Sequence, residues 1–222
     1  GGLAKGQIVR EIDALGGLMG IAADNTGIQF RILNASKGPA VRGPRCQSDK
    51  YAYAREVQRL LKTRSNIQLI QGVVDDILVE DGKTHGVVYS NPQQGINHQT
   101  LNAAAVILTT GTFMRGLMHT GEAKTQGGRV DEGSAEGISG NLTKLGLELG
   151  RLKTGTPPRL AAESINFDIL KEQPGDEQPQ PFSDMTGIAS FPPQKQVCCW
   201  ITETCADSHE HIKANLDRAP LF

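Results

Sequence analysis

The sequence lacks the features that would place it in a membrane or in a cysteine-stabilised fold. None of its apolar runs approaches the roughly 20 residues that cross a bilayer, and no signal-peptide pattern is present. Four cysteines are too few for a disulfide scaffold, and none of their spacings is that of a zinc site. The five histidines suggest neither a catalytic triad nor a metal cluster. We therefore expect no metal site, no membrane association and a reducing compartment in which the thiols stay free.

A strong net charge is also missing, but the charges are unevenly distributed. The net charge is −1, which by itself argues neither for nor against nucleic acid. Residues 31–64 carry nine basic side chains against Asp49 and Glu56, whereas residues 160–222 lean acidic. This asymmetry suggests a polyanionic partner on one face. A solvated helix with a few loop arginines is the alternative.

The length of 222 residues and an apolar fraction of 38% suit one full domain or two smaller ones. In the first third, apolar spacing predicts a helix over 7–15, which Gly16 and Gly17 should stop. The pattern then predicts a strand over 28–33 and a basic loop over 37–45. A helix over 49–63 should follow, with Ser48 as its N-cap.

The middle of the chain reads as a succession of strands. They are expected over 67–70, 73–79, 86–89, 100–101 and 103–109, with a hairpin turn at Asp81-Gly82 and a tight turn at Thr110-Gly111. A helix over 138–149 should follow. Residues 174–193 are rich in Pro, Gln and Asp, which favours irregular structure before a strand over 196–202 and a helix over 208–216.

Two features suggest a dinucleotide ligand. The first residues, GGLAKG, form a glycine-rich turn at the start of a helix, where free N–H groups and the helix dipole attract anions. The order of strands over 71–112 is that of FAD enzymes of the glutathione-reductase type. In these enzymes the backbone near the first strand meets the adenine, here at Val74, and the returning strand ends in a Gly, here Gly111. A simple turn and an ordinary β-meander are the alternatives.

Three longer stretches are more specific than any spacing. GGLAKGQIVREIDALGG over 1–17, NASKGPAVR over 34–42 and GRLKTGTPPR over 150–159 occur in this order. Together they closely resemble the MnmG (GidA) family, FAD-dependent enzymes that modify the wobble uridine of certain tRNAs at C5. The resemblance runs over essentially the whole chain, including its tail NLDRAPLF.

The resemblance implies an α/β fold. Residues 1–155 would be part of a FAD-binding Rossmann-type domain with an inserted β-meander, and 156–222 would begin an insertion domain. Family members start with a βαβ unit that carries the Gly-rich fingerprint, and they continue well past residue 222. We therefore expect the chain to be an internal part of such an enzyme, inactive alone.

The family pattern also implies roles for single residues. Gly1, Gly2, Lys5 and Gly6 match a Gly-rich loop beside the flavin, and Val74 matches a backbone contact to FAD. After Gly127-Gly128-Arg129 the family has a flavin-contacting Ser. This sequence has Ala135 there and Ser134 one residue earlier, so Ser134 takes the role only if the loop shifts. Cys199, in Cys-Trp-Ile-Thr, matches a cysteine near the reaction centre.

Each of these residues also has an ordinary structural interpretation. Cys199 could be a buried apolar residue and Lys5 a surface lysine. Arg42 and Arg45 lie among Gly and Pro, where a rigid turn could present them to RNA phosphate, or they could form structural ion pairs. Lys153 and Arg159 are expected to line the substrate cleft.

The implied activity is addition of a carboxymethylaminomethyl-type group to C5 of the wobble uridine. FAD, NADH as reductant and methylenetetrahydrofolate as carbon donor would be the cofactors. The implied partners are tRNA, the GTPase MnmE and a second copy of the protein, in the cytoplasm or, in a eukaryote, the mitochondrion. Another flavin oxidoreductase, a folate-dependent tRNA methylase and a non-enzymatic RNA-binding module are the alternatives.

Overall fold

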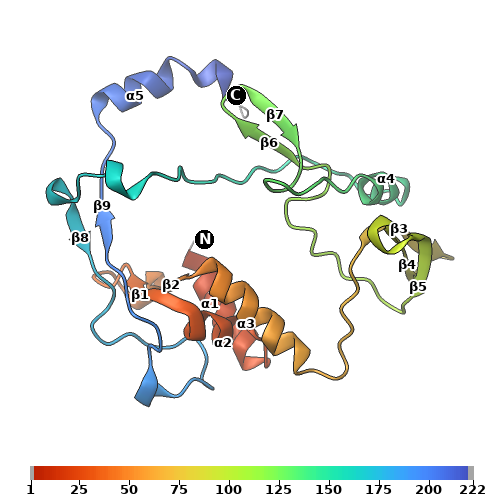
Figure 1. The fold of residues 1–222 in the computed structure, drawn as a ribbon, viewed down its shortest axis with the longest axis horizontal. Helices are drawn as coiled ribbons and strands as arrows, with labels where there is room; N and C mark the ends of the chain where they lie inside the picture. Colours follow the sequence, from red (N-terminus) through yellow and green to blue (C-terminus); the bar gives the residue numbers. More distant parts are fainter. Residues whose placement is uncertain (1–2, 220–222) are drawn as a thin grey trace. The chain divides into compact units, whose positions relative to one another are not determined.

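The computed structural model describes residues 3–219, which form two compact units (Figure 1). Unit 1 contains the residues up to Gln68 together with Arg159–Ile212, and unit 2 contains Leu69–Pro158 with the residues from Lys213 onward. The class is mixed α/β, as expected. The division into a FAD-binding domain over 1–155 and an insertion over 156–222 concerns ligand binding and stays a prediction.

Unit 1 begins with the helices α1 (Leu3–Ala14) and α2 (Met19–Thr26). The predicted glycine stop of α1 is confirmed. Gly16 adopts a left-handed φ of 82°, its N–H donates to the Asp13 carbonyl, and the Gly17 N–H donates to the Ile12 carbonyl. This pair of reverse bonds is a Schellman motif, in which a glycine avoids the steric cost of positive φ.

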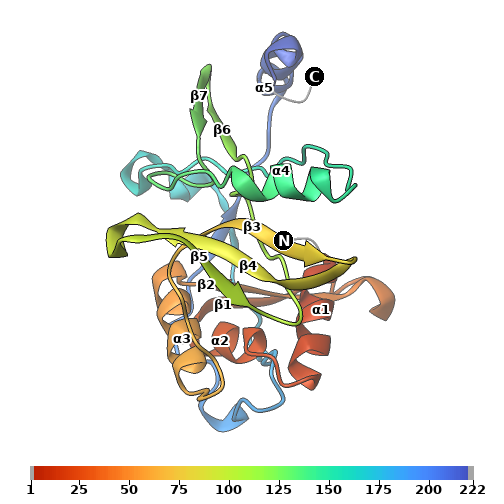
Figure 2. The same ribbon diagram turned by 90° about the vertical axis from the view of Figure 1, so that its right-hand side faces the viewer.

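A two-stranded antiparallel ribbon, β1 (Gly27–Leu33) with β2 (Gly43–Ser48), follows these helices. The strand over 28–33 is thereby confirmed, but the basic segment over 37–45 is only partly a loop, because β2 already starts at Gly43. Phe30 lies opposite Cys46 in the register, and both belong to a core with Val9 and Phe182. One face of the ribbon is therefore apolar and packs on the helices (Figures 1 and 2).

Helix α3 (Lys50–Lys62) follows β2. Its predicted extent is correct, but its N-cap is Asp49 and not Ser48. The Asp49 carboxylate accepts the N–H groups of Tyr51 and Ala52 at 2.9 and 2.8 Å. Ser48 is instead the last residue of β2, where its hydroxyl contacts the Cys46 sulfur.

Glu56 of α3 forms a hydrogen bond that links α3 to α2. It accepts two bonds from the Arg59 guanidinium, at 2.7 and 2.8 Å, and one of 2.8 Å from the Asn25 amide. The Arg59 guanidinium is the main reason that the pKa of Glu56 falls from 4.5 to about 2.

We expect Glu56→Gln to lower the stability of unit 1 at neutral pH and to have little effect near pH 2. A carboxyl whose pKa is lower in the folded state stabilises that state above its ordinary value of 4.5, and this contribution is lost as the pH falls toward 2. Arg59 is largely exposed, so salt should weaken the effect. Thermal denaturation of both proteins between pH 2 and 7 measures it, and a difference that stays constant with pH would contradict it.

Unit 2 contains the three-stranded antiparallel sheet β3 (Val73–Glu80), β4 (Lys83–Asn91) and β5 (Ile96–Asn102). The predicted hairpin at Asp81-Gly82 and the edge strand over 100–101 are confirmed. Asp81 and Gly82 have positive φ, of 49° and 73°, which matches the twist of the two strands they join.

Helix α4 (Gly137–Lys144) packs against β3 (Figure 2). Ile138 and Leu142 are buried with Ile77 of β3, and Val74 and Val106 pack around them. The helix is shorter than the predicted 138–149, because Gly146 has a φ of 83° and ends it with a second Schellman motif.

Two predicted strands are wrong. Residues 67–70 and 104–109 belong to no strand within residues 3–219, and Ala103 only donates its N–H to the His85 carbonyl of β4 at 2.9 Å. Ile107 is 86% exposed and Leu69 61%. A run of apolar residues becomes a strand only where a neighbouring strand takes up its N–H and C=O groups. Each sheet described here is antiparallel, so the Rossmann-type sheet stays a prediction.

The remaining elements are short. They are the hairpin β6 (Leu117–Thr120) with β7 (Ala123–Gln126), the ribbon β8 (Lys171–Gln173) with β9 (Cys199–Ile201), helix α5 (Ala206–Lys213) and six single 3₁₀ turns. The strand over 196–202 and the helix over 208–216 are thus confirmed with shifted ends, and 174–193 is irregular apart from one 3₁₀ turn. In the part of the chain described here, no helix combines the length and the apolar character that crossing a membrane requires.

Candidate functional site

The second face of the β1–β2 ribbon is polar and carries most of the candidate site in unit 1. Side chains alternate between the two faces of a strand, and the register sets Gln29 opposite Gln47 and Arg31 opposite Arg45. We call these four residues the amide face. The chain segment over 171–201, which we call the arm, is bound to this face by hydrogen bonds.

Gln29 is the central residue of the amide face. It is fully buried, at 0% exposure. Its amide nitrogen donates to the carbonyls of Gln173, at 3.0 Å, and Val197, at 3.3 Å. Its amide oxygen accepts a 2.7 Å bond from Arg45. All the hydrogen-bonding groups of this buried amide are thereby used, as burial of a polar side chain requires.

Further bonds continue along β1. The Val197 N–H donates to the Ile28 carbonyl at 2.7 Å. Arg31 donates to the Pro174 carbonyl at 2.6 Å, and the Ile32 N–H donates to the Asp176 carboxylate at 2.8 Å. These bonds hold two parts of the arm to β1, residues 173–176 and Val197, and the second lies just before β9.

Cys199, the first residue of β9, meets the amide face at Gln47. The Gln47 amide nitrogen lies 3.4 Å from the Cys199 sulfur as a donor, and its oxygen lies 3.7 Å away as an acceptor. The sulfur belongs to a half-buried residue and is not fully enclosed by the core. Of the two interpretations offered by the sequence, the geometry therefore disfavours a plain buried apolar cysteine.

Cys46 is on the opposite, apolar face. Burial raises the pKa of its thiol to about 11, so it is protonated at neutral pH and a poor nucleophile. Cys205 is exposed, and hydrogen bonds from Ser208 lower its pKa. The four thiols are therefore in different environments, and Cys199 is the one that faces a polar side chain of another element.

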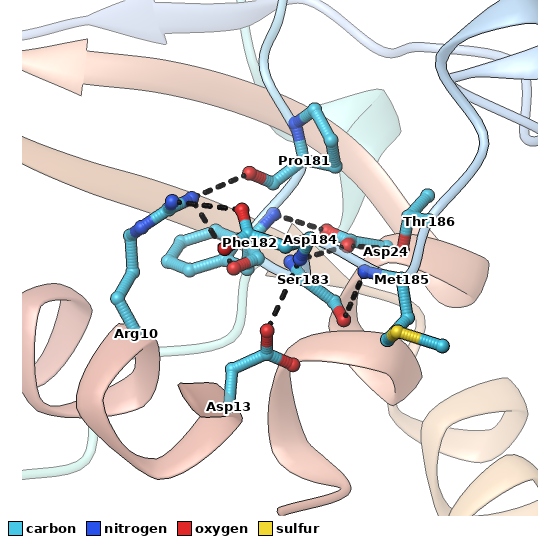
Figure 3. A network of polar contacts seen from close by, with 9 residues as sticks. All are labelled: Arg10, Asp13, Asp24, Pro181, Phe182, Ser183, Asp184, Met185 and Thr186. Atoms are coloured by element: carbon cyan, nitrogen blue, oxygen red, sulfur yellow. Dashed lines mark hydrogen bonds and ion pairs between the residues drawn. The ribbon is translucent and has the colours of Figure 1, made fainter. Parts of the chain in front are cut away.

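A second polar network anchors the middle of the arm to α1 and α2 (Figure 3). Asp24 of α2 is 0% exposed. Its carboxylate accepts the N–H groups of Phe182 and Ser183, at 2.8 and 2.9 Å, and the Thr186 hydroxyl at 2.7 Å. Figure 3 shows the segment over 181–186 folded around this carboxylate.

The exposed side of the same network is formed by α1. Arg10 donates to the carbonyls of Pro181 and Phe182 and to the Asp184 carboxylate, and Asp13 accepts the Asp184 N–H at 3.1 Å. A cavity of about 260 Å³ lies beside the segment. Its lining includes Ile21, Asn25, Thr186 and Phe191.

The other predicted residues of unit 1 have varied surroundings. Gly1 and Gly2 lie outside the described residues. Lys5 is exposed in the first turn of α1, whereas Gly6 is buried against the Pro44 carbonyl of β2. Both are helical, because α1 starts at Leu3, so the predicted glycine-rich turn does not extend to Lys5 and Gly6.

The two predicted RNA-binding arginines also have different surroundings. Arg42 is exposed and bonds to the Lys37 carbonyl at 3.2 Å. Arg45 bonds to the neutral Gln29 amide and forms no ion pair among the described residues. Its Nε is buried and lacks a partner there. Lys153 and Arg159 are exposed on either side of the boundary between the two units.

Within unit 2, no contact among the described residues brings Val74, Gly111 and Ser134 together. Val74 packs in the core between β3 and α4. Gly111 is exposed in a turn with a φ of 59°, and there is open space on the side where a Cβ would project, with Phe113 the nearest atom at 4.0 Å. Ser134 donates to the Glu136 carboxylate at 2.6 Å. Their roles toward FAD stay predictions.

Comparison with known proteins shows the family. The model of the family described as glucose inhibited division protein A, GIDA, matches residues 1–222. The chain belongs to the GidA family. It is 48% identical over 228 residues to the tRNA uridine 5-carboxymethylaminomethyl modification enzyme MnmG of Rhodopirellula baltica and 46% identical over 222 residues to that of Protochlamydia amoebophila. In both alignments it is covered completely and spans 34% of the relative.

Solved structures agree with the sequence comparison. The chain superposes on GidA of Aquifex aeolicus with a TM-score of 0.88 in one crystal form and 0.85 in the other, at 41% identity. It is covered completely and spans 36% of the Aquifex chain. The GidA fold of this chain is therefore established over its described length.

Sequence reasoning missed three residues that position this part of the GidA fold: Asp24, Gln29 and Gln47. A signal for the two glutamines was present, because polar residues alternate at 29 and 31 and again at 45 and 47. Such alternation is typical of a strand with one polar face. Asp24 gave a weaker signal, as a lone acid within the small-residue stretch GIAADNTG.

Proposed function

We propose that this protein is an FAD-dependent enzyme that modifies a tRNA uridine at C5. The observation that carries the proposal is 48% identity, over the whole chain, to enzymes named for the 5-carboxymethylaminomethyl modification of tRNA uridine. The chain spans about a third of those relatives, so the activity is proposed for the full-length protein and not for these residues alone.

Two features support contact with FAD. Lys5 is exposed within the first turn of α1, where helix N–H groups are free and the dipole is positive, so this end suits a phosphate. Gly111 has no side chain, and the space beside it is open, so a ligand could approach its backbone closely. Its left-handed φ is one that glycine adopts without strain. These residues fit a dinucleotide, and the bound flavin would supply hydride transfer from NADH.

Cys199 is the proposed nucleophile toward the base. Its thiolate would add to C6 of uridine, forming an S–C6 bond while the C5–C6 π electrons move to C5. C5 would then form a bond to the one-carbon unit, whose bond to a nitrogen of the donor breaks and leaves its electron pair on that nitrogen. Loss of the C5 proton with cleavage of the S–C6 bond would restore the ring. The half-buried sulfur on the polar face of the ribbon suits such a role, since a nucleophilic thiol needs both access and a polar neighbour.

The basic stretch supports an RNA substrate. Arg42 follows the 3₁₀ turn Pro39–Val41, and its exposed side chain donates to the neutral Lys37 carbonyl, so its charge remains available to phosphate. A wobble base lies in a loop and can leave its stack, which lets a thiol reach C6. Methylenetetrahydrofolate, the GTPase MnmE and a second copy of the protein complete the proposal, which places the enzyme in the cytoplasm or a mitochondrion.

The test uses the full-length protein. We expect it to purify yellow with bound flavin, and we expect Cys199→Ser to keep the flavin but to modify tRNA about 100-fold more slowly. Cys198→Ser is the matched control, since the Cys198 sulfur donates to the Cys199 carbonyl and to no side chain within residues 3–219; it should keep full activity. A colourless protein that takes up no FAD would overturn the cofactor, and a wild-type rate in Cys199→Ser would overturn the nucleophile.

A further inference from the structure

We infer that Gln47 is the positioning residue for the Cys199 sulfur, which it orients by donating a hydrogen bond to it. This inference rests on the proposed function, in which Cys199 reacts with the base. It is drawn from the contact between two residues that are 152 positions apart in the sequence and come together only through the arm.

The Gln47 amide can form a hydrogen bond with the Cys199 sulfur whether that sulfur is a thiol or a thiolate. The Gln47 amide nitrogen can donate to a thiolate at 3.4 Å, and the amide oxygen can accept from a thiol at 3.7 Å. Hydrogen-bond donation to the charged form of a group favours that form. Gln47 thus supplies a neutral donor beside the sulfur.

The surrounding structure holds both partners in place. Gln47 lies on β2 opposite Gln29, whose amide bonds to the Val197 carbonyl two residues before Cys199. The Val197 N–H bonds in turn to the Ile28 carbonyl. Figure 1 shows the arm passing along β1 before it becomes β9. A side-chain donor is effective when its partner is fixed in this way, since little ordering is then needed at the moment of reaction.

The test measures alkylation by iodoacetamide in the full-length protein with Cys198→Ser as the background. Peptide mass spectrometry gives the ratio of the initial rates at Cys199 and Cys205, so the exposed Cys205 is an internal reference. We expect Gln47→Leu, which removes the donor, to lower this ratio about five-fold. Gln47→Glu keeps the shape but places a negative charge beside the sulfur, and it should lower the ratio more than ten-fold.

The order of the two variants separates positioning from packing. If Gln47 only filled space, the isosteric Gln47→Glu would resemble the wild type and Gln47→Leu would have the larger effect. Gln58→Leu and Gln58→Glu are matched controls on the exposed side of α3 and should leave the ratio unchanged. A ratio that stays constant or rises in Gln47→Leu, or that is no lower in Gln47→Glu than in Gln47→Leu, would overturn the inference.

Steady-state kinetics separate this inference from the proposed function. If both are right, Gln47→Leu lowers kcat for tRNA modification about five-fold and leaves KM for tRNA within two-fold, because Gln47 acts on the sulfur and not on the RNA. If alkylation follows the expected order while kcat is unchanged, Gln47 positions the sulfur as inferred, and the chemical role proposed for Cys199 is wrong.

Discussion

Asp24→Ala is expected to lower the free energy of opening of the segment over 181–186 by about 3–5 kcal/mol. The substitution leaves the Phe182 and Ser183 N–H groups and the Thr186 hydroxyl without their acceptor, in a place where Asp24 and Ser183 are both 0% exposed. Each buried donor without a partner costs about 1–3 kcal/mol. Native-state hydrogen exchange of the Phe182 and Ser183 amides in the full-length protein measures the loss directly.

Two variants bracket this prediction. Asp24→Asn keeps one acceptor oxygen and should cost about half as much. Asp13→Asn changes the exposed part of the same network, where the bond goes to the Asp184 N–H, and should cost less than about 1 kcal/mol. Exchange at Phe182 and Ser183 that is no faster in Asp24→Ala than in Asp13→Asn would show that the carboxylate does not hold the segment.

Gly6→Ala is expected to destabilise the protein by about 3 kcal/mol, although alanine is the better helix former by about 1 kcal/mol. A Cβ at position 6 would lie 2.3 Å from the Pro44 carbonyl oxygen and about 3.1 Å from the proline ring. Because the nearest atom belongs to the backbone of β2, relief requires α1 to move away from the ribbon.

Gly140→Ala is the matched control for this substitution. Gly140 lies in α4 with no atom near the position of a Cβ, so alanine there should be neutral or should stabilise by up to about 1 kcal/mol. Thermal denaturation of the two variants and the wild type gives the comparison. If Gly6→Ala melts with the wild type, close packing of α1 on β2 is not the reason for a glycine at position 6.

Gly6 also shows that a glycine in a predicted ligand-binding motif can have a packing role of its own. The sequence suggested a flavin contact because glycine allows a ligand to come close. The structure shows that the backbone that comes close to Gly6 is that of Pro44. Contact of the flavin with the neighbouring Lys5 stays a prediction, which the FAD content of Lys5→Ala would test.

Most local structure could be predicted because its causes are local. Gly16 stops α1 through its own left-handed conformation, and Asp81-Gly82 turns the hairpin for the same reason. The predicted strand over 103–109 does not form, because an apolar run becomes a strand only beside a partner strand, and residues 104–109 have none within residues 3–219. The helix over 138–149 was predicted too long because leucine spacing outweighed the stop at Gly146.

The amino-acid sequence by itself determined the family, the glycine stop of α1 and the hairpin at Asp81-Gly82, because each depends on residues that are near one another or on runs that few other families share. Only the tertiary structure decided that Gln47 meets Cys199, that Gln29 and Asp24 are buried, and that Arg45 bonds to an amide. These contacts join residues 16–162 positions apart, and no local pattern encodes which distant carbonyl or sulfur a side chain will reach once the arm has packed on the ribbon.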